Sequence, residues 1–325
     1  MDGIINVLKP PGMTSFDVVA ILRGITGVRR IGHAGTLDPM AAGVLPVCVG
    51  RAAKAIEFLM DKDKLYRAEL TLGITTDTQD TTGTITSRAE PEVSDSDIAD
   101  AVSSFEGRYL QIPPMHSAVR VDGKRLYELA REGVEIERQQ REVEIFSAKL
   151  LDVDRSNGVR ALIDIHCSKG TYIRTLCADI GARLGCGGCM SFLLRMRAGP
   201  FGISDAITLE ELSELKEKGT LHSALIGVDR VFGSLEAYRL DEASEKRFGN
   251  GMQIPLSQAL LLDGGSNSTV KGDSKDRRGL KISEYRENSG LVRVYGSNGD
   301  FIALGMVLDD GKGYYLKVRK FFKIP

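Results

Sequence analysis

Residues 32–50 read GHAGTLDPMAAGVLPVCVG and join two contrasting halves. The second half, residues 43–50, is an apolar run bounded by glycines, and this pattern predicts a buried strand. The first half, residues 32–39, gathers special backbone residues around a single carboxylate, that of Asp38. The role of that carboxylate decides how the chain is interpreted.

Two interpretations of Asp38 are open from this stretch alone. An Asp-Pro pair fits a helix N-cap followed by proline at the first helical position, which would make Asp38 a structural cap. Alternatively, Pro39 keeps Asp38 out of the α region, and Gly35 lets the backbone approach a ligand closely. The result would be a rigidly held carboxylate, with His33 beside it, that acts as a nucleophile or base.

Composition sets the broad class of protein. The chain has 325 residues, 42% of them hydrophobic and 27% charged, with a formal net charge of −1. These values are ordinary for a globular protein, and any surface that binds nucleic acid must be a local patch. Residues 311–325, GKGYYLKVRKFFKIP, are one candidate patch and equally fit a basic final strand.

Targeting and redox features favour a cytoplasmic protein. The N-terminal stretch has no signal-peptide pattern, and the longest apolar runs are too short to span a membrane. The five cysteines are odd in number and scattered, which predicts reduced thiols. Cys186 and Cys189 have CxxC spacing, but no second pair completes a zinc site, so no metal is expected.

Periodicity predicts strands and helices in alternation, and thus a mixed α+β domain with a large, mainly antiparallel sheet. Capping-box signals at 14–17, 94–97 and 208–211 predict three helix starts. The expected strands are 3–9, 43–50, 64–73, 141–153, 159–170 and 190–201, and two further helices are expected at 51–60 and 171–185.

Two other segments stand apart from this domain. Residues 115–141 are highly charged and offer few core positions, which predicts an exposed insertion. After about residue 230 the pattern changes to short strands, with a strong hairpin signal at Asn298-Gly299, and a small all-β module is expected. Residues 264–281 are polar and glycine-rich, which favours a loop or a partly disordered segment.

The stretch KGTYIRTLCADIGARLG at 169–185 adds a second cluster of polar residues. Tyr172 and Arg174 fall at the start of the predicted helix. Arg174 is a candidate partner for a buried carboxylate, which it would keep charged. Taken alone, Arg174 is better explained as a surface arginine and Tyr172 as a half-buried packing residue.

Several of these stretches together resemble the TruB family of tRNA pseudouridine synthases. The resemblance rests on GHAGTLDPMAAGVLPVCVGRAAK, KLYRAELTLGITTDTQD and CSKGTYIRTLCADIGARLG, in this order, and on KPPGMTS at 9–15 and QIPPMHSAVRVDGKRLYELAREG at 111–133. It covers roughly residues 3–230. The last quarter resembles a PUA domain more loosely, and residues 256–290 fit no recognised pattern.

The resemblance implies a fold, domains and a reaction. It implies the pseudouridine synthase fold over residues 1–230, with an RNA-gripping insertion at about 107–141, and a PUA-like RNA-binding domain at 235–325. The implied reaction isomerises uridine 55 of the tRNA T-loop without a cofactor. The base is flipped out of the RNA, its bond to C1′ breaks, and the base rejoins the ribose through C5.

The resemblance also implies roles for individual residues. Asp38 matches the essential aspartate, whether it attacks C1′, adds to C6 or removes a ribose proton. Arg174 matches its ion-pair partner, and Tyr66 matches the tyrosine that stacks on the base and assists loss of the C5 proton. The remaining matches are to substrate-binding positions: His33, Tyr172, Leu193, Lys124 and Arg125.

One departure from the family pattern and two rival functions remain. Where the family shows a histidine followed later by Leu-Arg-Arg-Thr, this chain has Cys189-Met190 and, at 194–197, Leu-Arg-Met-Arg. The rivals are a tRNA-binding or folding protein on the same scaffold and a guide-RNA-dependent pseudouridine synthase. The leading expectation is a monomer with no obligate protein partner, which binds the T-stem-loop and acceptor stem of tRNA and no membrane.

Overall fold

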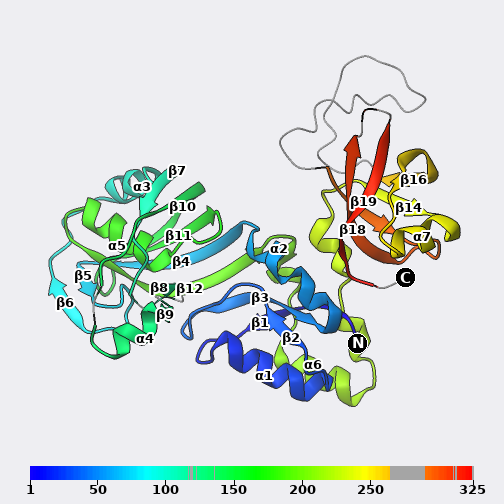
Figure 1. Cartoon of the computed structure of the whole chain (residues 1–325). Coiled ribbons are helices and arrows are strands. Elements are labelled where there is room, and N and C mark those ends of the chain that lie inside the picture. The colour runs from blue at the N-terminus through cyan, green and yellow to red at the C-terminus, as the bar shows by residue number, and fades with distance from the viewer. Residues whose placement is uncertain are drawn as a thin grey trace.

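Two β-sheets organise the chain in the computed structural model (Figure 1). The structure describes residues 1–115, 117, 120, 121, 123–134, 136–263, 290–309, 311 and 313–323. A nine-stranded sheet takes up most of the chain up to residue 202, and a six-stranded sheet follows residue 236. Among the described residues, no helix is both long and apolar enough to cross a lipid bilayer.

The nine-stranded sheet is mixed and mainly antiparallel, as the sequence predicts. Its order is β1 (Gly3–Lys9), β3 (Ala42–Val49), β12 (Gly188–Ala198), β4 (Lys64–Leu72), β11 (Arg160–Cys167), β10 (Arg141–Asp154) and β7 (Gly107–Gln111), with β2 (Ile31–His33) on β3 and β13 (Phe201–Gly202) on β12. The β3–β12 pair is parallel, and it joins the two halves of the sheet. This junction positions the candidate site.

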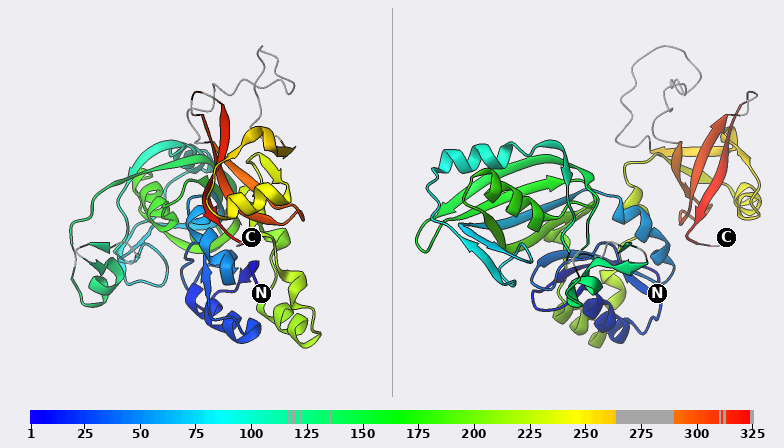
Figure 2. Two further views of the ribbon diagram at one scale, coloured as in Figure 1. Left: turned by 45° about the vertical axis from the view of Figure 1, so that its right-hand side comes forward. Right: turned by 60° about the vertical axis from the view of Figure 1, so that its left-hand side comes forward.

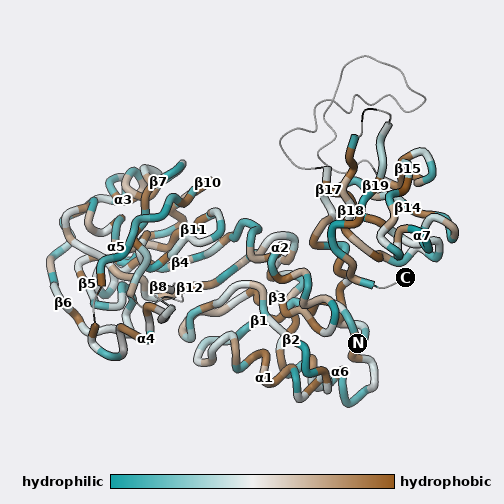
Figure 3. Tube along the Cα trace, viewed as in Figure 1, coloured by the Kyte–Doolittle hydropathy of each residue, from teal (hydrophilic) through white to brown (hydrophobic). Residues whose placement is uncertain are grey.

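Helices cover the two halves separately (Figure 2). Helices α1 (Ser15–Thr26) and α6 (Leu209–Glu217) pack on β1 and β3, whereas α3 (Asp95–Ser103) and α5 (Ile173–Arg183) pack on β4, β10 and β11. The three predicted capping boxes are present, at the starts of α1, α3 and α6. Hydrophilic colour dominates the free ends of β7 and β10, whereas α1 carries hydrophobic stretches (Figure 3).

The helix predicted over residues 51–60 is only half correct. The segment begins as a 3-10 helix, η1 (Gly50–Ala55), and ends as the single-turn α2 (Ile56–Met60). The residue before η1, Val49, has no side chain that can cap an α-helix, so a tighter turn forms first. Met60, the last residue of α2, is 51% exposed.

Smaller elements connect these layers. The two-stranded β5 (Ile74–Thr76) and β6 (Ile85–Arg88) follow β4, and the insertion contains β8 (Arg120–Val121), β9 (Lys124–Arg125) and α4 (Leu126–Arg131). Leu126 is fully buried, so the insertion has a core position of its own. Three 3-10 turns, η2 (Ile203–Asp205), η3 (Leu221–Ala224) and η4 (Val228–Phe232), lead out of the sheet domain.

The last quarter is a β-rich module, as predicted, and it also contains one helix that the sequence analysis did not predict. Its sheet runs β15 (Ile254–Pro255), β19 (Tyr314–Phe321), β18 (Phe301–Asp309), β17 (Leu291–Tyr295), β14 (Ala237–Leu240) and β16 (Ala259–Asp263), with α7 (Glu242–Gly249) and η5 (Leu256–Gln258). The β17–β18 hairpin turns at Asn298-Gly299, which confirms the predicted turn. The glycine-rich segment 264–281 lies outside the described residues.

Aromatic side chains join this module to the main domain. Phe58 and Phe232 precede the module in the chain, and Phe301 and Phe322 belong to it. The rings of all four lie in one hydrophobic cluster. The Lys54 ammonium also donates to the Phe321 carbonyl at 2.9 Å. Because the phenylalanine cluster is apolar and largely buried, it fixes the module against η1 and α2.

Candidate active site

Asp38 lies on the loop that connects β2 to β3, at the junction of the two half-sheets. The backbone makes a β-turn here, in which the Ala41 amide donates to the Asp38 carbonyl at 3.0 Å, and β3 begins at the next residue. No helix starts at Asp38, so its interpretation as a helix cap is wrong. The carboxylate is instead free to face another side chain.

That side chain is Arg174, at the start of α5. Arg174 Nε lies 2.9 Å from Asp38 Oδ2, so the two stretches that seemed separate in the sequence meet as an ion pair. The Arg174 side chain is 6% exposed, whereas that of Asp38 is 35% exposed. The carboxylate therefore faces solvent on one side and is held by a buried cation on the other.

Arg174 is itself held by the segment after β5. Its Nη1 donates to the Thr78 carbonyl at 3.2 Å and lies 3.7 Å from Asp80 Oδ2. Asp80 is buried, and its other carboxylate oxygen accepts hydrogen bonds from the Thr78 and Thr82 hydroxyls and the Thr82 amide. The resulting network of two carboxylates around one guanidinium fixes the orientation of Arg174.

Three buried polar side chains from three elements hold the backbone of the Asp38 loop. Lys9 Nζ donates to the Ala41 carbonyl at 2.6 Å and the Pro39 carbonyl at 3.3 Å. The Ser15 hydroxyl bonds both backbone groups of Leu37, at 2.9 and 3.2 Å. The Arg195 guanidinium binds carbonyls on both sides of the loop.

Lys9 is fully buried without a carboxylate in salt-bridge contact, as far as the described residues show. Burial lowers the pKa of Lys9 to about 8, against a partly opposing effect of the Asp38 charge. A buried ammonium that caps carbonyls is costly to desolvate, so its position beside the loop is specific rather than incidental.

Apolar groups form the wall of the site opposite the ion pair. Tyr66 and Leu193 lie on the adjacent strands β4 and β12, and they belong to one buried cluster with Leu37 and Ala41 of the Asp38 loop. Burial raises the pKa of the Tyr66 hydroxyl, and the charge of Arg195 opposes that rise. An aromatic face and a hydroxyl are thus available beside the carboxylate.

The remaining predicted residues surround this centre. Tyr172 is the residue before α5, and its backbone exchanges two hydrogen bonds with the Gln111 side chain, at 2.8 and 3.0 Å. His33 ends β2, at the start of the Asp38 loop. Burial lowers the pKa of His33, and the Arg195 charge lowers it further, so the imidazole is neutral at pH 7.

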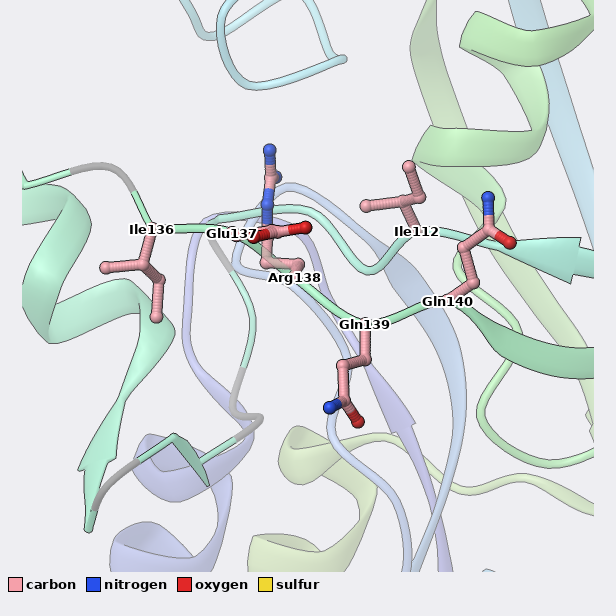
Figure 4. A pocket seen from close by; sticks show the side chains of 6 residues that line it. All are labelled: Ile112, Ile136, Glu137, Arg138, Gln139 and Gln140. Atoms are coloured by element: carbon pink, nitrogen blue, oxygen red, sulfur yellow. The ribbon is translucent and has the colours of Figure 1, made fainter.

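The insertion follows Gln111, whose side chain bonds Tyr172, and its base lines an open pocket of about 820 Å³. The pocket lies between Ile112 on the outgoing chain and residues 136–140 on the return, where Arg138 and Gln139 point in different directions (Figure 4). The backbone at Lys124 and Arg125 forms β9, but their side chains lie outside the described part of the structure.

Sequence reasoning missed three residues of this arrangement: Lys9, Asp80 and Arg195. Lys9 and Asp80 fall inside motifs that carry the family resemblance, and Arg195 lies in the stretch 194–197 that departs from the family pattern, yet each is a charged residue at a buried position. Arg195 carried a usable signal, because it interrupts an apolar strand, SFLL, at a position where a surface arginine would be out of phase. In the described ranges, no three His, Cys, Asp or Glu side chains gather closely enough to hold a metal ion.

The fold and this site together define a pseudouridine synthase. Two family models match in succession: the TruB family pseudouridylate synthase N-terminal domain over residues 23–173, and the tRNA pseudouridylate synthase B C-terminal domain over residues 174–233. The chain belongs to the TruB family of pseudouridylate synthases.

Curated relatives agree over most of the chain. The tRNA pseudouridine synthase B of Alkaliphilus oremlandii is 49% identical over 254 residues, which cover 78% of this chain and 83% of the relative. That of Clostridium kluyveri is 39% identical over 322 residues, which cover 99% of this chain and the whole relative. The similarity therefore extends through the C-terminal module.

Solved structures show the same architecture. A Cbf5-Nop10-Gar1 complex contains a chain that superposes with a TM-score of 0.70 at 27% identity, over 98% of this chain and 84% of that one. An archaeal box H/ACA Nop10-Cbf5 complex gives a TM-score of 0.68 at 25% identity. Both superpositions include the C-terminal sheet as well as the main domain.

Proposed function

We infer that this chain isomerises uridine 55 in the T-loop of tRNA to pseudouridine. The observation that carries this inference is the Asp38–Arg174 pair: a half-exposed carboxylate on a rigid loop, oriented by a buried guanidinium. A carboxylate that faces RNA repels the phosphates and so weakens binding. Its position is explained if it reacts at the ribose of the substrate.

The reaction assigns each side of the site a task. The uridine leaves the RNA stack and enters between the Asp38 loop and the wall formed by Tyr66 and Leu193. Asp38 acts at the sugar, and Arg174 keeps its carboxylate oriented. Tyr66 stacks on the base and assists loss of the C5 proton, and Tyr172 completes the frame around the uracil.

RNA outside the site is bound by shape and by phosphate contacts. We assign residues 1–230 to catalysis, with His33 at the flipped nucleotide and Lys124 and Arg125 of the insertion at the phosphates. Residues 235–325 form the PUA-like part that holds the acceptor stem. Lys317 and Arg319 of β19 are exposed for this contact, whereas Lys320 and Lys323 pair with Glu57 and Asp300.

This enzyme acts as a monomer without a protein partner or guide RNA, in contrast to the Cbf5 complexes that share its fold. The five free cysteines fit the expected cytoplasmic location. The test is conversion of a bare T-stem-loop RNA by the purified chain, followed as tritium release from C5-labelled uridine. Release by the chain alone supports the proposal, and release only after a guide RNA and partner proteins are added overturns it.

A further inference from the structure

Gln111, the last residue of β7, holds the start of α5 through a two-point contact. Its side-chain oxygen accepts a hydrogen bond from the Tyr172 amide at 2.8 Å, and its Nε2 donates to the Tyr172 carbonyl at 3.0 Å. Nε2 also donates to the Tyr109 hydroxyl. Gln111 is 1% exposed, so its amide is fully engaged by protein groups in the interior.

Helix α5 has no cap of its own at this end. Helices α1, α3 and α6 each begin with a capping box. Tyr172, the N-cap residue of α5, makes no side-chain cap hydrogen bond, and the first turn of the helix contains no acidic residue. Because the first amides of a helix need partners outside it, the contact from Gln111 supplies from a distant strand what the local sequence lacks.

The start of α5 sets the geometry of the ion pair. The Tyr172 carbonyl also accepts a hydrogen bond from the Leu176 amide at 3.0 Å, so the contact from Gln111 and the first turn of the helix share one group. Arg174 is the second residue of α5, and its Nε lies 2.9 Å from Asp38 Oδ2. The segment after β5 binds only the Arg174 side chain in this network, so a shift of the helix start would move Arg174 relative to Asp38.

The same contact joins α5 to the strand that carries the insertion. Gln111 pairs with Arg141 across β7 and β10, and the chain between these two residues forms the projecting part of the insertion. That chain lines a pocket of about 490 Å³ together with Thr175 and Asp179 of α5. Beside this opening, Gln111 is a fixed polar contact between the base of the insertion and the helix of the site.

We propose that Gln111 is a positioning residue for the reaction: it holds the Tyr172 backbone at the start of α5 and thereby keeps Arg174 aligned with Asp38. The inference rests on the proposed pseudouridine synthase activity. Gln111 takes no part in the chemistry itself, because its amide is occupied by protein groups. Its loss therefore slows the chemical step and leaves RNA binding intact.

Two substitutions test the two-point contact. Gln111→Met keeps the length of the side chain and removes both its donor and its acceptor. Gln111→Glu keeps the shape, and a protonated carboxyl offers one donor and one acceptor, so it can bond both backbone groups of Tyr172. An ionised carboxylate instead places an acceptor against the Tyr172 carbonyl. Burial favours the neutral form of the introduced carboxyl, so a fall in pH should restore the contact.

The matched control is Asn6→Asp, which introduces a buried carboxyl away from α5. Asn6 is also 1% exposed, and its Nδ2 donates to the Gly202 carbonyl at 2.9 Å. Of the titratable groups around Gln111, burial raises the pKa of Tyr109, so its hydroxyl stays neutral, and burial raises the pKa of Asp179 to about 6. Because Asp179 titrates in every variant, each rate is expressed relative to the wild type at the same pH.

Single-turnover rates, affinity for a T-stem-loop RNA and melting temperature are measured between pH 5 and pH 8. Gln111→Met is expected to be slower by about 10- to 100-fold at every pH, the range for a misplacement of about 1 Å, with little change in RNA affinity. Gln111→Glu is expected to be as slow at pH 8 and to recover towards the wild-type rate at pH 5. Asn6→Asp is expected to stay near the wild-type rate throughout.

A wild-type single-turnover rate for Gln111→Met overturns the inference, as does a Gln111→Glu protein that is no faster than Gln111→Met at pH 5. The same recovery in Asn6→Asp, or a loss of RNA affinity with an unchanged rate, also overturns it. If Gln111→Met does not fold, the comparison of Gln111→Glu at pH 5 and pH 8 decides alone. A wild-type chain that converts no uridine contradicts the proposed function instead, so the two failures are distinguishable.

Discussion

Buried polar side chains, rather than the loop sequence itself, make Asp38 a fixed group. Lys9, Ser15 and Arg195 bind the backbone on either side of it, and Arg174 binds its carboxylate. Each of these contacts is charge-assisted or fully buried, so the loop has little freedom to move. Rigid placement before substrate arrives is what a reactive carboxylate needs.

The carboxylate of Asp179, on α5, predicts a pH effect on stability. Burial raises its pKa from 3.8 to about 6, so the folded state binds its proton more tightly than the unfolded state does. Its contribution to stability is complete below about pH 4 and is lost as pH rises through 6. Asp179→Asn should remove this dependence.

Urea unfolding at several pH values between 4 and 7 checks this prediction. As the pH rises from 4 to 7, the free energy of unfolding of Asp179→Asn should increase relative to that of the wild type by about 2 kcal/mol. This value allows for the partial exposure of the side chain. A difference between the two proteins that is the same at every pH would contradict the assignment.

At the scale of elements, local signals predicted most of the fold. Capping boxes at Thr14, Ser94 and Thr208 marked three helix starts correctly, because the cap residues bond their own helices and need no distant partner. Strand β4 showed its alternation, since one face packs on α5 and the other does not. The 3-10 turn at 50–55 was missed, because periodicity does not distinguish it from an α-helix.

Local signals did not predict the candidate site in the same way. Asp38 and Arg174 were identified through family motifs, and no local pattern indicates that residues so far apart in the chain form an ion pair. Lys9 and Arg195 were missed because their roles come from the strand order β1-β3-β12-β4, which places both beside the Asp38 loop, and Asp80 was missed because its role comes from its contact with Arg174. Arg195 points inward because it shares a face of β12 with the buried Leu193, and the sequence does not show which groups its charge meets there.

The insertion predicts a salt effect on RNA binding. Replacement of Lys124 and Arg125 by alanine should weaken tRNA binding and flatten the plot of log affinity against log salt. The slope should change by about 0.9 for each duplex phosphate that is no longer neutralised, and by about 0.7 for each single-stranded one. The matched control is alanine at Lys149, within β10, and at Arg155, directly after it. A slope equal to that of the wild type would show that the insertion does not grip the RNA.

At the scale of the whole molecule, one aromatic cluster sets the distance between the catalytic site and the C-terminal sheet. Phe322 is 6% exposed and packs on Phe232 and Phe301, with ring centroids 5.7 and 5.4 Å apart. Because the cluster spans both parts, the two sheets should move as one body. A folded tRNA can then be bound at its T-loop and its acceptor stem at the same time.

Phe322→Ala tests this coupling. Truncation of a buried phenylalanine costs about 3–5 kcal/mol, and here the cost falls on the docking of the module. Affinity for full-length tRNA should decrease while activity on an isolated T-stem-loop persists, and proteolysis near residues 233–236 should become faster. Phe146→Ala, at a ring that is 46% exposed, is the control. Equal losses on both substrates would contradict the separate roles of the two parts.

The central claim is that the Asp38 carboxylate carries out the chemistry. Asp38→Asn preserves size and the acceptor oxygen that faces Arg174 Nε, 2.9 Å away in the wild type, so fold and tRNA binding should persist. An amide is neither a competent nucleophile nor a base, so tritium release from C5-labelled uridine in tRNA should fall to background. Near-normal release by a well-folded Asp38→Asn protein, measured beside a binding assay and a melting curve, would contradict the account.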